Sequence, residues 1–132
     1  MPTKAQAALL KRIRAKLTPD LLAPEFGRPD RRTRGGKVRG HCYVASEALY
    51  HLLGGPSSGW FPCQGRVEGV SHWWLENDQG DVLDVTVAQF ERVPDYLNVG
   101  QPRGFLTRQP SARAFELLHR LGWSGNRRKP RR

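Results

Sequence analysis

Cysteine is scarce in this sequence. Only Cys42 and Cys63 occur among 132 residues, whereas a secreted domain of this size usually carries several paired cysteines. The shortage argues against a disulfide-rich extracellular fold, so we expect reduced thiols and a cytoplasmic location. A single bond between the two cysteines is an open alternative, because it requires only that their backbones come within about 7 Å.

Long apolar runs are absent as well. No stretch approaches the ~18 apolar residues that a membrane-spanning helix needs. The residues after Met1 alternate Lys or Arg with Ala and Leu, a pattern unlike the apolar centre of a secretion signal. These absences predict a cytoplasmic protein without a membrane partner.

Acidic residues are few. Asp and Glu number 12 against 22 Lys and Arg, and the formal net charge is +10. Such an excess favours anionic partners such as nucleic acid, an acidic protein or a lipid surface, and it carries no information about the fold. The cations gather in residues 1–40 and in the tail at 124–132.

The length and the apolar spacing predict one α+β domain. We expect a small antiparallel sheet packed against a buried helix, with a further helix at each end of the domain. The predicted helices span residues 3–17, 20–22, 42–53 and about 110–121, and the predicted strands span 63–67, 70–76 and 82–85. In the last helix, Phe115, Leu118 and Leu121 are expected to face the core. Residues 91–104 are expected to be irregular.

The predicted domain has three parts. A helical segment (1–26) and a basic loop (27–40) precede the core (41–123), and a disordered basic tail (124–132) follows. The basic loop contains several glycines, so it suits either a phosphate clamp or a solvated connector.

A hairpin with reactive side chains is predicted at residues 70–86. The run Asn77 to Asp81 suits a three-residue turn with Gly80 in the left-handed position. Because side chains alternate along a strand, this register puts His72 and Asp84 on one face, within side-chain reach. A four-residue turn would move Asp84 to the other face and make Asp81 the candidate partner instead.

Cys42 opens a predicted helix, directly after His41. Unpaired backbone N–H groups and the helix dipole stabilise a thiolate at such a position, so we expect a lowered pKa. A nearby histidine could then carry the proton. The alternative is a small buried apolar residue, which is the usual role of a free cysteine.

The order of these residues resembles the transglutaminase-like and papain-like cysteine enzyme superfamily. The string HWWLE at 72–76, followed by VLDVT at 82–86, is similar to the transglutaminase-core pattern of His, aromatic and Glu, then an apolar pair, Asp and Thr. The helix that begins at Cys42 resembles that family's nucleophile helix. The resemblance covers residues 38 to 90. The whole chain also looks like small bacterial and phage proteins, from which no activity follows.

The resemblance implies a thiol hydrolase or acyltransferase of the protease, deamidase or amidase type. Cys42 would be the nucleophile, His72 the general base and acid, and Asp84 the residue that orients the imidazole. The substrate would be a protein or peptide amide, or a thioester, and no cofactor is needed. The stretch 34–39 departs from the family because it lacks the glutamine or tryptophan that completes the oxyanion hole. The second donor beside the Cys42 N–H is therefore unidentified.

Other polar and aromatic residues have less specific roles. Trp74, His41 and Tyr43 are the candidate substrate contacts, Glu76 is expected at the surface, and His51 and His119 lie on helices without an evident role. A zinc site from His41, Cys42, Cys63 and His72 is conceivable. However, adjacent ligands do not fit the usual spacing of structural zinc, so we predict no metal.

A second function class stays open beside the enzyme. The chain could be a non-catalytic basic protein on a degenerate papain-like scaffold, binding nucleic acid or an acidic protein partner through its basic termini. No known single-strand or RNA-binding motif is visible in support of it.

Overall fold

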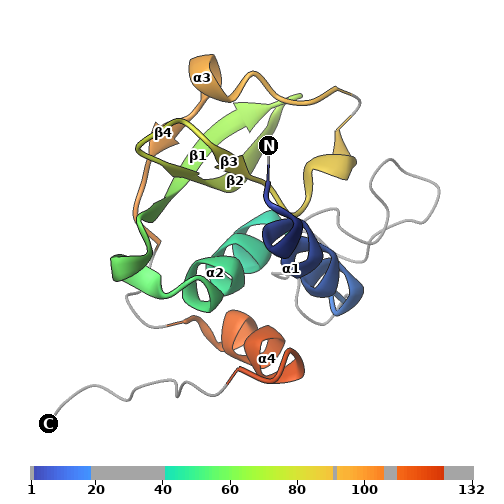
Figure 1. Cartoon of the computed structure of the whole chain (residues 1–132). Helices are drawn as coiled ribbons and strands as arrows, with labels where there is room; N and C mark the ends of the chain where they lie inside the picture. The colour runs from blue at the N-terminus through green and yellow to red at the C-terminus, as the bar shows by residue number, and fades with distance from the viewer. Residues whose placement is uncertain (1, 19–40, 91, 106–109, 124–132) are drawn as a thin grey trace, which may run out of the picture.

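The computed structural model describes residues 2–18, 41–90, 92–105 and 110–123 (Figure 1). The described chain combines helices with a four-stranded antiparallel sheet, so the α+β class is confirmed. The predicted helix at 20–22, the basic loop at 27–40 and the tail at 124–132 lie outside the described residues.

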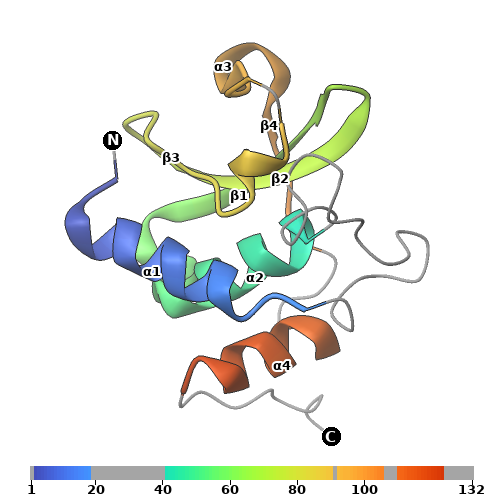
Figure 2. The same ribbon diagram turned by 90° about the vertical axis from the view of Figure 1, so that its right-hand side faces the viewer.

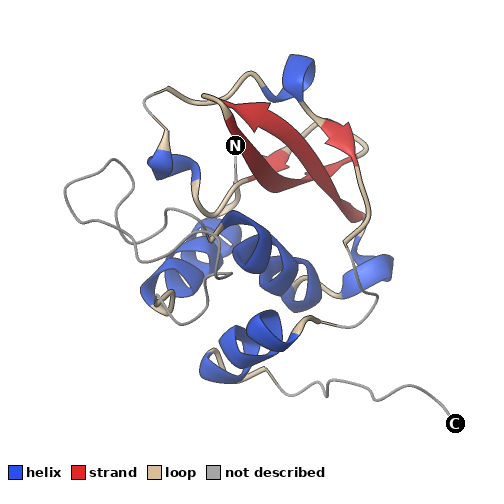
Figure 3. Cartoon of the chain, turned by 180° about the vertical axis from the view of Figure 1, so that it is seen from behind, coloured by secondary structure: helices blue, strands red, loops and turns tan. Residues whose placement is uncertain are grey.

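Three longer helices form one layer and the sheet forms the other. The longer helices are α1 (Lys4–Ala15), α2 (Cys42–Leu52) and α4 (Ala112–Arg120), and the shorter ones are η4 (Gly55–Ser58), η5 (Val87–Gln89) and α3 (Tyr96–Val99). In Figure 2, α2 lies between the sheet and α4, and α1 lies beside α2. Seen from behind in Figure 3, the strands form an upper layer above these helices. None of the helices in the described ranges is long and apolar enough to cross a membrane.

The strands follow the order β3-β2-β1-β4 across the sheet. Their bounds are β1 (Trp60–Val67), β2 (Val70–Asn77), β3 (Val82–Leu83) and β4 (Gln101–Pro102). Two predictions were wrong in detail. The segment after Phe90 is not wholly irregular, because it forms α3 and β4, which are too short to produce a periodic pattern. In addition, β3 ends at Leu83 rather than at residue 85, because the chain turns into η5.

The hairpin between β2 and β3 has the predicted register. Leu75 pairs with Leu83, and the Asn77 N–H donates to the Asp81 carbonyl at 3.2 Å. Gly80 has φ of 81°, the left-handed conformation expected of the third turn residue. His72 and Asp84 are therefore on the same face, and the alternative with Asp81 as the partner is excluded.

The two faces of the sheet are covered differently. Leu75 and Leu83 point toward the helical layer and join the core formed with α1, α2 and α4. His72 and Trp74 point the opposite way because side chains alternate along β2. There Trp74 packs so tightly against the chain around α3 that a Cβ atom on Gly100 would lie 2.3 Å from its ring. His72 and Trp74 therefore lie on the face that does not join this core.

Helix α4 is attached to α2 by a buried polar contact. The carboxylate of Glu47 on α2 is fully buried and accepts hydrogen bonds from the backbone N–H of Ser111 at 2.7 Å and from its hydroxyl at 2.8 Å. Leu118 and Leu121 are buried in the core as predicted, and Ala114 and Leu117 join them. Phe115, which was also expected to face the core, is only half-buried.

Candidate active site

His72 and Asp84 form the centre of the site. The Nε2 atom of His72 lies 2.6 Å from Oδ2 of Asp84, and the histidine has no exposed surface. The short strand β3 ends at Leu83, one residue before Asp84. The predicted register places the Asp84 carboxylate next to the imidazole of His72. The contact predicted from the turn residues is therefore present.

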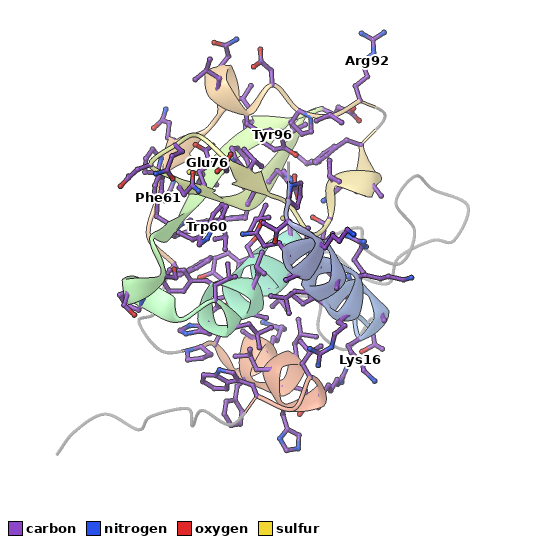
Figure 4. The ribbon with its side chains drawn as sticks, in the orientation of Figure 1. Lys16, Trp60, Phe61, Glu76, Arg92 and Tyr96 are labelled. Atoms are coloured by element: carbon purple, nitrogen blue, oxygen red, sulfur yellow. The ribbon has the colours of Figure 1, made fainter. Side chains whose placement is uncertain are left out.

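The carboxylate of Asp84 is held by two further donors. The hydroxyl of Tyr96 donates to Oδ2 at 2.7 Å, and the backbone N–H of Thr86 donates to Oδ1 at 3.2 Å. Figure 4 shows Tyr96 below α3, directed toward the sheet. Burial and the negative charge of Asp84 raise the pKa of the Tyr96 hydroxyl, so this group stays a donor. The orientation of the Asp84 carboxylate is thus fixed from three elements.

The imidazole of His72 is enclosed on its other sides. The ring of Phe90 meets it edge-on with centroids 4.5 Å apart, and the ring of Trp74 lies 5.6 Å away. The side-chain amide of Gln89 faces the remaining ring nitrogen, with Nε2 of Gln89 at 3.4 Å from Nδ1 of His72. Both ring nitrogens of His72 consequently have polar neighbours inside the protein.

Cys42 is the first residue of α2 and lies against the edge of β2. Its sulfur donates to the carbonyl oxygen of Ser71 at 3.8 Å. This edge is free because β3 pairs with β2 only at Leu75 and Glu76. Within the described chain the sulfur makes no hydrogen bond to His72, although the two residues lie on adjoining parts of the site.

Cys42 is a thiol in this structure. Burial raises its pKa from 9.0 to about 11, and the negative charge of Asp84 adds to the increase. The backbone N–H groups of Trp73, Tyr43 and Cys42 itself act in the opposite direction, but burial outweighs them. The pKa lowering that we predicted from the helix start is therefore reversed by desolvation.

The predicted substrate contacts are mostly inside the protein. Trp74 has no exposed surface, and its indole N–H donates to Glu76 at 2.8 Å. His41 is also buried, and its Nε2 lies 2.8 Å from the Thr18 carbonyl oxygen, which connects the end of α1 to the start of α2. Tyr43 is half-buried against Trp73. Of the three predicted contacts, only Tyr43 keeps appreciable surface for a ligand.

The second cysteine lies on β1, opposite Trp74. Both cysteines are free and buried. Burial first, and then the nearby carboxylate of Glu76, raise the pKa of Cys63 to about 12. Glu76 is half-buried and hydrogen-bonded, so its assignment to the open surface was wrong. No group of three or more potential metal ligands occurs in the described ranges.

Gln89 and Tyr96 are site residues that the sequence interpretation missed. Both follow the hairpin, in a stretch that was only partly assigned to structure, and both reach back to the His72–Asp84 pair. Gln89 and Tyr96 lie in elements of three and four residues, which are too short to produce a periodic pattern that could have pointed to them. His51, packed near Trp123, and the exposed His119 contribute nothing to the site.

Comparisons with known proteins do not identify a relative. No protein-family model, curated protein or solved structure matches this chain. The function must therefore be argued from the residues themselves.

Proposed function

We propose that the protein is a cysteine-dependent acyl-transfer enzyme, a hydrolase or acyltransferase that acts on an amide or thioester. One observation carries the proposal, the buried His72–Asp84 pair at 2.6 Å. The residue before His72 on β2 is Ser71, whose carbonyl oxygen accepts the hydrogen bond of the Cys42 thiol. A carboxylate in this position fixes the imidazole tautomer and stabilises the imidazolium that forms during acyl transfer. The fold that we propose for this core is papain-like or transglutaminase-like.

The proposed reaction begins with proton transfer from Cys42 to His72. The thiolate attacks the carbonyl carbon, and a C–S bond forms as the carbonyl oxygen becomes an oxyanion. When the tetrahedral intermediate collapses, the C–N or C–S bond of the substrate breaks, and the imidazolium of His72 returns its proton to the leaving group. Water or an amine then attacks the acyl-enzyme, gives a proton to His72 and releases Cys42.

Backbone N–H groups are the candidate oxyanion donors. The amides of Cys42, Tyr43 and Trp73 lie close enough to the sulfur to lower its pKa. Trp73 is on the part of β2 that does not pair with β3. Its N–H is therefore our candidate for the second oxyanion donor, which the sequence left unidentified. Loss of one such donor typically costs about 2.7–4 kcal/mol of transition-state stabilisation.

Acylation by an activated ester tests the proposal without knowledge of the natural substrate. The protein is incubated with p-nitrophenyl acetate at pH 8, and the acetylated residue is identified by peptide mass spectrometry. We expect acetyl transfer to Cys42 in the wild type and in Cys63→Ala, and slower transfer in His72→Ala. An equal rate of Cys42 acetylation in the wild type and in His72→Ala would refute the enzyme proposal.

The cationic face of α1 favours a second candidate function, the binding of nucleic acid. Helix α1 contains four basic and no acidic residues, and Lys16 follows as its C-cap. Lys4, Lys11, Arg12 and Lys16 are exposed, with exposed alanines between them. Figure 4 shows Lys16 at the end of α1, away from the sheet. Small residues between cations let a phosphate backbone approach the helix closely. The proposal is a sequence-independent phosphate contact, which can coexist with acyl transfer.

Salt dependence separates this candidate from simple solubility. Binding of a labelled DNA duplex is measured by fluorescence anisotropy between 50 and 200 mM salt. Replacing Lys4 and Lys11 by Gln should weaken binding and reduce the salt slope by about 2, because each phosphate contact contributes about 0.9. The matched control replaces the exposed Arg103 and Arg113 by Gln. Equal effects of both pairs would argue against a defined surface on α1.

A further inference from the structure

Gln89 contacts the catalytic pair through an amide with a fixed orientation. The residue is buried at the end of η5, and its Nε2 lies 2.9 Å from Thr86 Oγ1 and 3.2 Å from the Thr86 carbonyl oxygen. A carbonyl oxygen can only accept a hydrogen bond, so the NH₂ group of Gln89, and not its oxygen, must face Thr86. The same NH₂ group then lies 3.4 Å from His72 Nδ1.

This orientation determines the protonation of His72. The Nε2 atom is the donor to the Asp84 carboxylate, which can only accept. Nδ1 faces the donor group of Gln89 and must therefore carry the lone pair. The hydrogen bonds favour a neutral imidazole with its proton on Nε2, because a proton on Nδ1 would point at the N–H of Gln89.

We propose that Gln89 is a positioning residue that fixes the Nε2–H tautomer of His72 and blocks Nδ1 as the acceptor of the Cys42 proton until a substrate displaces the amide. The inference rests on the proposed function. Since Nε2 is bonded to Asp84, Nδ1 is the nitrogen that must receive the proton of Cys42. Gln89 occupies that nitrogen in this structure, so amide and thiol compete for the same lone pair.

The hydrogen bonds of the surrounding ionisable groups do not involve Nδ1 of His72. These groups are Asp84 after β3, Cys42 on α2, Tyr96 on α3, Glu76 on β2 and Arg14 on α1. Asp84 contacts Nε2 of His72, and Tyr96 donates to Asp84. The guanidinium of Arg14 donates to the Val85 carbonyl at 3.4 Å and does not touch the imidazole. Gln89 is thus the polar group that faces Nδ1.

The test compares wild type with Gln89→Met, which keeps the side-chain length but cannot donate, and with Gln89→Ala. Gln101→Ala is the control, because Gln101 is exposed on β4. The pH midpoint of Cys42 alkylation is measured by mass spectrometry, with Cys63 as the internal reference. The midpoint, unlike the rate, does not respond to easier entry of the reagent. The tautomer of His72 is read from long-range proton–nitrogen NMR spectra of labelled protein.

We expect the Nε2–H tautomer in the wild type. In both Gln89 variants, the thiolate fraction of Cys42 at a given pH should rise about 2- to 10-fold, the effect of losing one hydrogen bond between neutral groups. The control and Cys63 should not change. An unchanged Cys42 midpoint in both folded variants, or an Nδ1–H tautomer in the wild type, overturns the role of Gln89.

The two proposals fail in different ways. If the Gln89 variants behave as expected while p-nitrophenyl acetate never acetylates Cys42 faster than Cys63, the positioning role stands and the enzyme proposal falls. If acetylation depends on His72 but the Gln89 variants shift neither midpoint nor tautomer, the enzyme proposal stands and the role of Gln89 is refuted.

Discussion

The buried thiol of Cys42 makes the stability of the protein depend on alkaline pH. Its pKa is about 11 in the folded chain and 9.0 for an ordinary cysteine, because burial disfavours the thiolate. At a pH between these values the unfolded chain has lost the proton and the folded chain still holds it. The unfolded state then binds fewer protons, so the free energy of unfolding falls as the pH rises.

The size of the effect follows from the two pKa values. The full contribution is present below pH 9, and each pH unit up to about 11 removes about 1.4 kcal/mol. Cys42 alone therefore costs about 3 kcal/mol of stability across this range. This is a large share of the 5–15 kcal/mol that is typical for a domain. Cys63 acts in the same direction, since burial and Glu76 raise its pKa to about 12.

Urea denaturation at pH 8, 9, 10 and 11 measures this loss. We expect the free energy of unfolding of Cys42→Ala to fall less steeply than that of the wild type, by about 3 kcal/mol in total. The free energy of unfolding of Cys63→Ala should also fall less steeply than that of the wild type. A separate effect in each variant shows that the two thiols contribute separately. Parallel curves for wild type and Cys42→Ala would mean that the Cys42 thiol has the same pKa in the folded and the unfolded chain, and they would refute the effect of burial described here.

Three further substitutions probe the contacts around the site and the core. Tyr96→Phe removes the donor to Asp84 and should lower the free energy of unfolding by about 1–3 kcal/mol and slow acetylation of Cys42; a thermal melt and the ester assay that both match wild type would contradict this. Gly100→Ala places a Cβ atom 2.3 Å from the Trp74 ring and should cost about 1–3 kcal/mol in urea denaturation, and a neutral result would show that the ring can shift. Glu47→Ala leaves two donors at the start of α4 without their acceptor, so we expect a loss of about 1–3 kcal/mol and faster hydrogen exchange in α4 than in β2; uniform exchange would argue against a local role.

The hairpin was predictable from the sequence because its geometry is local. The turn residues select a loop length, the loop length sets the register, and the register decides which face Asp84 occupies. Apolar spacing and helix-boundary residues predicted the starts of α2 and α4 within a residue or two. Each of these features depends on residues that are close together in the sequence.

The remaining features depend on long-range packing. The depth at which Cys42 is buried follows from how α2 packs on the sheet, and only this burial reverses the effect of the helix start on its pKa. Tyr96 lies 12 positions after Asp84, in a helix of four residues that has no periodic signal. Gln89 reaches His72 because β3 is short, and strand propensity did not predict this early end of β3.

The early end of β3 is the feature that joins these contacts. A strand that continued beyond Leu83 would pair with β2 at Trp73 and Ser71, and the sulfur of Cys42 would lose both the Ser71 carbonyl and the Trp73 N–H. It would also carry Gln89 away from His72, since η5 could not fold back over that face. The same termination thus frees the strand edge for the thiol and brings the amide to the imidazole. A single backbone feature thus sets the positions of the thiol and the amide around His72.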